Sequence, residues 1–383
     1  MDLKKKSKAG ALAGLRVVDM SRILAGPLCT QVLADHGADV IKVEAPGGDD
    51  TRAWGPPFQG TDAAYFLSVN RGKKSVVIDL RTDTGVLKLL DLLQGADVLV
   101  ENLRPGTFSR WGIGDRESIR RRFPTLIHCH ISGFGDTGPL GGKPGYDAAL
   151  QAMVGLMSVN GTADGPATRI GVPAVDMVTG YNAAIGILMA LLERHRSGTG
   201  QNVDISLFES GLALMHPHLG NYLQSGEPPA RSGNAHPNIV PYDSFGTASG
   251  PVFLAVGNDA QFARLCRHLG LDDLIEDLRF ATNSDRCKNR AELTEILGGQ
   301  LGQHHAGPLA EELSEIGVTC VPVLSLPEAL EHPHTAHCGT IIDVDGVPGC
   351  ASPIRLSRTP ASYDRPPPKL DEHGREVFPA DQN

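Results

Sequence analysis

Hydrophobic and polar positions alternate along the chain in the rhythm of an α/β fold. Residues 15–20 (LRVVDM) and 38–46 (ADVIKVEAP) are short and rich in β-branched residues, as strands are, and the helical pattern of 28–37 lies between them. The same rhythm continues through residues 74–80, 85–96, 97–103, 116–122 and 126–135. The pattern predicts a Rossmann-like open parallel sheet, whose ligands bind beyond the carboxyl ends of the strands.

A change of composition divides the chain further on. Residues 225–238 (SGEPPARSGNAHPN) are rich in Pro, Gly, Ser and Asn, which predicts a linker. We expect a large α/β domain over 1–215, a smaller α+β domain over 232–335, and a segment over 340–383 that packs back on the large domain. Two short strands are expected in that last segment, within 340–346 and 351–357.

Composition and charge narrow the class of protein. The 383 residues carry a formal net charge of −9, which argues against a nucleic-acid binder. Seven scattered cysteines without a C-x-x-C pair indicate reduced thiols and a cytoplasmic location. The basic N-terminus has no long apolar segment behind it, so no export is expected. The longest apolar run, 183–192, is shorter than the roughly 20 residues that cross a bilayer. It predicts a core helix rather than a membrane span.

One carboxylate stands out, in the segment 171–180 (GVPAVDMVTG). Asp176 lies between a strand-like run and a long apolar helical run, so it is expected near a helix N-terminus. The free N–H groups there favour an ionised carboxylate, the form that attacks a carbonyl. The alternative is that Asp176 is only an N-cap, a position where Asp is common.

Polar residues also follow the predicted strands directly, as a phosphate-rich ligand would require. These residues are Lys42, Glu44, Asp79, Arg81, Asn102, Arg104 and the stretch 132–135. Neither a dinucleotide fingerprint nor a P-loop is present, and the glycine-rich stretch 132–147 is interpreted as a flexible loop.

Two groups of histidines and cysteines raise the question of a metal. They are His332, His334, His337 and Cys338, and His128 and His130 beside Cys129. The first group lies in a segment broken by prolines, and the second alternates along one strand, so no metal is predicted.

Eight motifs in order resemble the class III CoA-transferases, the formyl-CoA transferase and CaiB/BaiF family. The matching segments are 21–27 (SRILAGP), 38–44 (ADVIKVE), 48–57 (GDDTRAWGPP), 68–80 (SVNRGKKSVVIDL), 100–106 (VENLRPG), 131–139 (ISGFGDTGP), 144–148 (PGYDA) and 171–180. The detail is most similar to the dicarboxylate branch, typified by succinate:hydroxymethylglutarate (glutarate) CoA-transferase. Ala45 and Leu24 stand where the formyl-CoA enzyme has Arg and Gln, which argues against formyl or oxalate specificity.

The resemblance implies an interlocked homodimer and names Asp176 as the nucleophile. A coenzyme A thioester is then a substrate, and no cofactor is bound permanently. By position, the coenzyme A contacts fall on Leu24, Ala25, Ile78, Asp79, Leu80, Arg81, Asn102, Leu103, Arg104, Arg110 and Lys143. Succinyl-CoA as donor also rests on the resemblance.

The chemistry of Asp176 suits such a transfer, because a carboxylate that attacks a thioester forms a mixed anhydride and the acyl group stays activated. Backbone N–H groups that follow Asp176 are expected to stabilise the oxyanions, and the glycine-rich loop is expected to exclude water. A dicarboxylate acceptor needs a cation for its distal end, for which Arg52, Arg169 and His236 are candidates.

Two alternatives remain open. The racemases of the same superfamily exchange the α-proton of a 2-methylacyl-CoA with a His–Asp pair, where this chain has Tyr146 and Asp147. Tyr146 is a poor proton acceptor near neutral pH, which favours transfer and leaves Tyr146 as a substrate-contact or packing residue. The other alternative is a non-catalytic acyl-CoA-binding protein. The partners expected are a second copy of the chain, acyl-CoA and a carboxylic acid, without nucleic acid or membrane.

Overall fold

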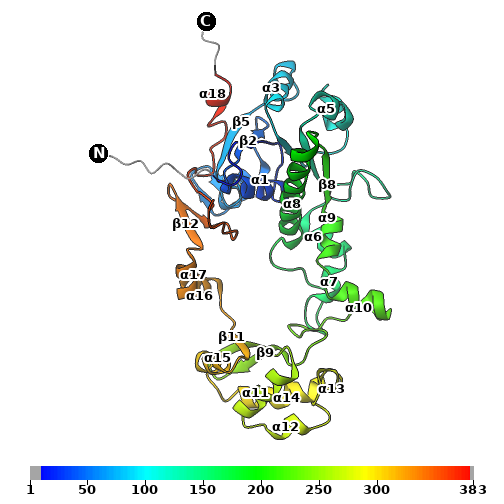
Figure 1. Cartoon of the computed structure of the whole chain (residues 1–383), viewed down its shortest axis with the longest axis vertical. Coiled ribbons are helices and arrows are strands. Elements are labelled where there is room, and N and C mark those ends of the chain that lie inside the picture. The colour runs from blue at the N-terminus through cyan, green and yellow to red at the C-terminus, as the bar shows by residue number, and fades with distance from the viewer. Residues whose placement is uncertain (1–9, 380–383) are drawn as a thin grey trace, which may run out of the picture. The chain divides into compact units, whose positions relative to one another are not determined.

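The chain forms two compact units in the computed structural model, which describes residues 10–379 (Figure 1). The basic residues behind the expectation about export precede this range. The first unit holds the chain up to Val154, Ile170–Leu214 and the chain from His334 onward, and the second holds Gly155–Arg169 and Met215–Pro333.

The first unit is built on a six-stranded sheet in which all neighbouring pairs are parallel. In spatial order the strands are β5 (Lys73–Val77), β2 (Asp39–Glu44), β1 (Arg16–Asp19), β6 (Val98–Glu101), β7 (Ile127–Ser132) and β8 (Asn202–Ser206). Numbered along the chain this order is 3-2-1-4-5-6, the doubly wound arrangement of dinucleotide-binding folds. The predicted open parallel α/β fold is confirmed. Its switch point lies between β1 and β6.

Helices cover both faces of this sheet. Apolar side chains of α3 (Asp83–Gln94), α4 (Thr107–Arg110) and α5 (Arg116–Arg122) share one buried cluster with side chains of β1, β2, β5 and β6. Helices α1 (Ala25–Asp35) and α8 (Ala174–Ser197) pack side by side, α1 on β1 and β2 and α8 on β7 and β8 (Figure 1). Short elements complete the unit: η1 (Asp50–Ala53), α2 (Ala64–Leu67), α6 (Asp147–Met153), α9 (Leu207–Ala213) and the hairpin of β3 (Phe58–Gln59) and β4 (Asp62–Ala63).

Helix α8 is longer than the apolar run within it. It spans 24 residues and, by length and composition alone, is the one helix of the described chain that qualifies as a membrane span. One side of it is buried by α1, α9, β7 and β8, whereas several large apolar side chains on the rest of its surface are exposed. It packs as a core helix on one side only.

The C-terminal segment covers the edge of the sheet at β5. His373 N–H donates to the Ser75 carbonyl, and Val77 N–H donates to the Asp371 carboxylate, so the exposed edge of the strand is partly occupied. The C-terminal part of the chain also contains helix α17 (Pro333–Cys338), a hairpin of β12 (Ile341–Val344) and β13 (Val347–Cys350), and helix α18 (Gly374–Val377).

The expected second strand over 351–357 is wrong, because the chain turns earlier. Asp345 and Gly346 both have positive φ, 53° and 83°, as a two-residue hairpin turn requires. Val344 therefore pairs with Val347, and the strand ends at Cys350.

The second unit combines a three-stranded antiparallel sheet with helices, which confirms the expected smaller α+β part. The strand order is β11 (Thr319–Pro322), β10 (Gly250–Ala255) and β9 (Tyr242–Thr247). Its helices are α7 (Leu156–Val159), α10 (His218–Ser225), α11 (Asp259–His268), α12 (Asp273–Glu276), α13 (Asn283–Lys288), α14 (Arg290–Leu301), α15 (Ala306–Glu315) and α16 (Leu326–Glu331).

The expected division of the chain differs from the observed one at residues 155–169. The sequence pattern predicts that they belong to the large domain, but they join the second unit through hydrogen bonds with the linker. The Arg231 guanidinium donates to the Gly165 carbonyl, and Gly233 N–H donates to the Gly161 carbonyl.

Candidate active site

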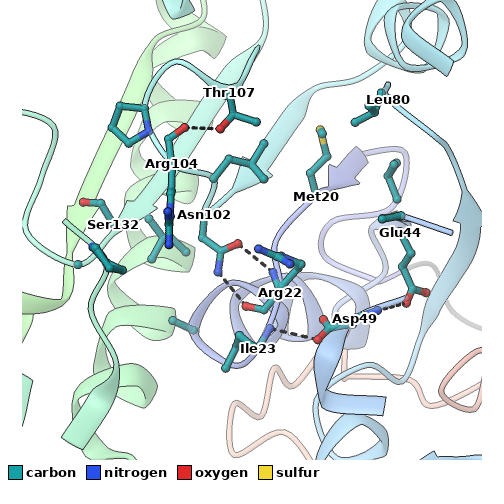
Figure 2. Close-up of a pocket in the computed structure, with 18 of the residues that line it drawn as sticks. Met20, Arg22, Ile23, Glu44, Asp49, Leu80, Asn102, Arg104, Thr107 and Ser132 are labelled. Carbon is teal, nitrogen blue, oxygen red and sulfur yellow. Dashed lines mark hydrogen bonds between the residues drawn. The ribbon is translucent and has the colours of Figure 1, made fainter. Parts of the chain in front are cut away.

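A pocket of about 750 Å³ opens at the carboxyl ends of the parallel strands (Figure 2). Residues that follow β1, β2, β5, β6, β7 and β8 all contribute to its wall. This is the edge where open α/β sheets bind their ligands, and it includes the switch point between β1 and β6.

The pocket brings together most of the residues singled out in the sequence. Lining residues among them are Leu24, Ala25, Ile78, Asp79, Leu80, Arg81, Asn102, Leu103, Arg104, Arg110, Lys143, Tyr146 and Asp176. Tyr146 is 64% exposed, so it lies at the rim rather than in the core. The gathering of these residues in one pocket leaves their individual roles as predictions.

Cationic side chains give the pocket a local charge opposite to that of the whole chain. Arg104 and Lys143 form no ion pair within the described residues, whereas Arg81 is paired with Asp79 and Arg110 donates to the Thr107 hydroxyl. Unpaired guanidinium and ammonium groups attract phosphate groups.

The glycine-rich loop that forms one wall is held in place. Gly133 and Gly145 pass so close that a Cβ on Gly133 would lie 2.7 Å from the Gly145 nitrogen. Asp136 on the loop accepts a hydrogen bond from His130 Nε2 at 3.0 Å and contacts Arg116 at 3.4 Å. The loop is therefore fixed where Gly133 meets Gly145 and again at Asp136.

Asp176 is the third residue of α8, and it does not cap the helix. The N-cap position is Pro173, whose side chain makes no cap hydrogen bond. The N–H groups of Val175 and Asp176 instead donate to one oxygen of Asp147, at 2.8 and 3.1 Å. The other Asp147 oxygen accepts from Gln151 at 2.6 Å. The interpretation of Asp176 as the cap is therefore wrong, because Asp147 of α6 takes that role.

This arrangement changes the electrostatics expected for Asp176, the predicted nucleophile. Asp176 is half-buried, and neither a hydrogen bond nor an ion pair of its carboxylate exists within residues 10–379. Burial, and then the negative charge of Asp147, raise its pKa to about 7. The expectation that the helix N-terminus favours the ionised form is outweighed, since the donors of that terminus serve Asp147.

The expected oxyanion donors after Asp176 are likewise wrong, because those N–H groups are bonded. Free donors lie instead at the start of α1, where no side chain caps the helix and the N–H groups of Leu24, Ala25 and Gly26 lack partners among the described residues. A Cβ on Gly180 would lie 2.6 Å from the Ala25 carbonyl oxygen, so α1 and α8 cross there in close contact. Asp176 lies one turn before Gly180 on the same helix face.

Arg52 does not line the pocket. The structure therefore corrects the prediction that Arg52 binds the substrate. Its guanidinium donates twice to Glu44, at 2.7 and 2.8 Å, and to Asp62 at 2.8 Å, and it lies over the ring of Phe66. Only 7% of Arg52 is exposed. Its guanidinium also donates to the Pro368 carbonyl at 3.2 Å, so its donors serve buried ion pairs and the C-terminal segment.

Arg169 and His236 belong to the second unit and do not line the pocket of the first. Arg169 is exposed. The ring of His236 packs 5.1 Å from that of Tyr242, and burial followed by Arg290 lowers its pKa.

Tyr65 is a residue near the site that the sequence reasoning missed. Burial, then the carboxylates of Asp176 and Asp147, raise its pKa to about 12, so its hydroxyl stays protonated at neutral pH. Its ring packs edge-on against Trp54 at 5.3 Å. Tyr65 is the second residue of the short helix α2, and its place in the sequence offered no signal that it is close to these carboxylates.

The histidine groups have other contacts. His128 and His130 both contact the carboxylate of buried Glu101, at 3.1 and 2.8 Å. Burial would raise the pKa of Glu101, but the two histidines lower it to about 2. Within residues 10–379 there is no cluster of three or more His, Cys, Asp or Glu side chains suited to a metal ion.

Comparison with known proteins defines the class to which this fold and pocket belong. Residues 12–374 match the model of CoA-transferase family III. The chain belongs to this family, and it is a class III CoA-transferase that acts on coenzyme A thioesters.

Particular relatives are similar over nearly the whole chain. The succinate–glutarate CoA-transferase of Agrobacterium fabrum is 43% identical, covering 96% of this chain and 94% of that protein. The mouse succinyl-CoA:glutarate CoA-transferase is 40% identical, covering 96% of this chain and 85% of that protein. A crystal structure of a CaiB/BaiF family protein from Brucella suis is 44% identical, with a TM-score of 0.86, and covers 97% of this chain and 99% of that one.

The electrostatics of Asp176 predict a pH profile. If the ionised carboxylate attacks, kcat/KM rises with pH through about 7 and then levels off. Asp147→Asn keeps an oxygen that accepts the α8 N–H groups but removes the charge, so the acid limb is expected to move to lower pH. Asp164→Asn, an exposed control outside the pocket, leaves the limb in place. If Asp147→Asn leaves the acid limb at the same pH, that result would contradict the assignment of the limb to the pair of Asp176 and Asp147.

Proposed function

We propose that the protein moves coenzyme A from succinyl-CoA to a free dicarboxylate such as glutarate or hydroxymethylglutarate. The names of the two relatives support this choice of donor and acceptor. The observation that carries the mechanism is Asp176, a half-buried carboxylate without a partner in the described chain, placed in the pocket beside free backbone donors. Leu24 and Ala45, apolar where the formyl-CoA enzyme has polar groups, both line this pocket.

In the first half-reaction an oxygen of Asp176 attacks the thioester carbonyl. The carbon–sulfur bond breaks, coenzyme A leaves as a thiolate, and a succinyl–aspartyl anhydride remains. The thiolate then attacks the aspartyl carbonyl, which releases succinate and leaves coenzyme A bound to Asp176 as a thioester. A raised pKa favours attack, because a more basic carboxylate is a better nucleophile.

The second half-reaction repeats these steps in reverse order. The incoming carboxylate attacks the aspartyl thioester, which expels the thiolate and forms a new mixed anhydride. The thiolate attacks the acyl carbonyl of that anhydride. The new acyl-CoA forms and Asp176 returns as a carboxylate, so bonds and charges balance over the cycle.

Each attack places negative charge on a carbonyl oxygen, for which we assign the N–H groups of Leu24 and Ala25 as donors. They begin a helix that crosses α8 close to Asp176, and a helix N-terminus favours an anion. Preorganised donors of this kind commonly lower a barrier by about 3 kcal/mol.

The phosphates of coenzyme A are assigned to the cationic side of the pocket. Arg104 and Lys143 form no ion pair within the described residues, and Arg110 and Arg81 also line the pocket. The predicted contacts with residues 78–81 and with Leu103 suit the rest of the nucleotide, since both segments follow strands at the same sheet edge.

Recognition of the distal carboxylate of the acceptor stays a prediction for Arg169 and His236, neither of which lines the pocket of the first unit. Both are basic residues of the second unit, and a dicarboxylate needs a cation to replace the water lost by its second charge. Arg52 is not retained, since Glu44 and Asp62 occupy it.

A transfer assay tests this function. The protein is incubated with succinyl-CoA and a pool of glutarate, hydroxymethylglutarate, malate, itaconate, oxalate and formate, and products are read by mass spectrometry. Glutaryl-CoA or hydroxymethylglutaryl-CoA is expected from the parent and is absent with Asp176→Asn. Asp164→Asn serves as the matched carboxylate control. Uptake of solvent deuterium by a 2-methylacyl-CoA, without transfer, would establish the racemase alternative instead.

We further propose that the working form is a homodimer, interlocked as in the family it resembles. Support comes from α8, on which Ile185, Leu188, Met189 and Leu192 are exposed at helical spacing. A contiguous apolar stripe of this kind is typical of an interface.

Light scattering after size exclusion tests the dimer. Met189→Glu combined with Leu192→Glu is expected to yield monomers, because two charges would be buried between copies. Leu87→Glu, at another exposed leucine of the first unit, leaves the dimer intact. Parent protein that elutes as a monomer at micromolar concentration would refute the proposal.

We propose a cytoplasmic location on the evidence of the thiols. All seven cysteines are free, and four of them are buried. Unpaired cysteines are typical of a reducing compartment.

A further inference from the structure

The loop between β1 and α1 contains a strained residue at the pocket wall. Ile23 has a φ of 72°, in the left-handed region that a β-branched side chain rarely adopts. Such a backbone is strained and persists only when its surroundings hold it. Leu24, the next residue, is the N-cap of α1, so the conformation of Ile23 sets the direction in which that helix begins.

The side chain of Asn102 holds the backbone of Arg22, the residue before Ile23. Its Oδ1 accepts a hydrogen bond from Arg22 N–H at 3.0 Å, and its Nδ2 donates to the Arg22 carbonyl at 2.8 Å. Figure 2 shows both bonds, with the Asn102 side chain reaching from β6 to the loop. The Asn102 amide therefore pairs with both backbone polar groups of Arg22, as a neighbouring strand would. It links the loop after β1 to the end of β6, on the two sides of the switch point.

Buried side chains anchor the rest of the loop. Lys42 donates to the Ser21 carbonyl at 2.9 Å, and Asp19 accepts from the Ser21 N–H at 2.9 Å. The Ile23 N–H reaches Asp49 at 3.4 Å, a long bond that restrains weakly (Figure 2). Within the described chain, no other pair of short hydrogen bonds holds Arg22, the residue directly before Ile23.

We propose that Asn102 is a positioning residue rather than a coenzyme A contact. Its bridge keeps Ile23 in the left-handed conformation and so aims the Leu24 and Ala25 N–H groups at the carbonyl that Asp176 attacks. The proposal rests on the proposed function for the role of those N–H groups. Its structural half, the restraint of Ile23, stands independently of any activity.

Kinetics separate the two roles of Asn102. Asn102→Ala is expected to lower kcat about tenfold or more with KM for succinyl-CoA nearly unchanged, because transition-state donors are misplaced. A contact with coenzyme A would instead raise KM and leave kcat intact, and that result overturns the proposal. Asn102→Asp keeps the acceptor but loses the donor to Arg22, so its kcat is expected to lie between those of the parent and of Asn102→Ala. This variant serves if the alanine variant does not fold.

A rescue experiment distinguishes positioning from general damage. Glycine adopts positive φ without strain, so in an Ile23→Gly background the loop no longer needs the bridge. There Asn102→Ala is expected to lower kcat by about threefold or less. An equal loss of kcat in both backgrounds would refute the coupling between Asn102 and Ile23.

A crystal structure of Asn102→Ala tests the restraint without any assay. We expect Ile23 to relax to negative φ and the first turn of α1 to shift. Ile23 that remains near 72° in the variant would overturn the proposal, even if the parent is an active transferase. A relaxed Ile23 in a protein that lacks transferase activity would uphold the restraint and refute only the proposed function.

Discussion

The site depends on two carboxylates that share one helix start, of which only one receives its hydrogen bonds. Asp147 takes the free N–H groups of α8, and Asp176 is left half-buried with no partner in the described chain and a negative neighbour. Burial and like charge both oppose ionisation, so the proposed nucleophile is kept basic. A carboxylate that pairs with Arg or caps its own helix would be stable but a poor nucleophile.

The scaffold around this pair is held more firmly than the pair itself. Lys42, Lys73 and Asp19 are fully buried, and although burial would raise the pKa of Asp19, the two lysines and hydrogen bonds lower it to about 2. These ion pairs fix the strand ends beneath the pocket, and the close crossing at Gly180 fixes α1 against α8. Rigid support of this kind allows strain at Ile23 and an unpaired charge at Asp176 to persist.

Much of the fold was predictable because it depends on local patterns. Strands, helices and the sheet edge follow from hydrophobic periodicity and from polar residues after each strand, and the position of Asp176 follows from the start of a long apolar helix. The capping by Asp147 was not predictable, since it joins residues 28 and 29 positions apart. Arg52 was misjudged for the same reason, because its partners Glu44 and Asp62 meet it only through folding. By contrast, the Asp345–Gly346 turn carried a readable hairpin signal that the strand pattern overrode.

The most direct test of this account is the pH dependence of thermal unfolding in the parent and in Asp176→Asn. The pKa of Asp176 is about 7 in the folded protein and ordinary, near 3.8, when unfolded, so the folded state holds its proton longer as pH rises. The ionised carboxylate therefore destabilises the parent above pH 7, and this penalty disappears below about pH 4. We predict that Asp176→Asn melts at least about 3 °C higher at pH 8.5 and equally at pH 4. A variant that melts at the same temperature as the parent at pH 8.5, or lower, would show that the Asp176 carboxylate is stabilised and would contradict the account.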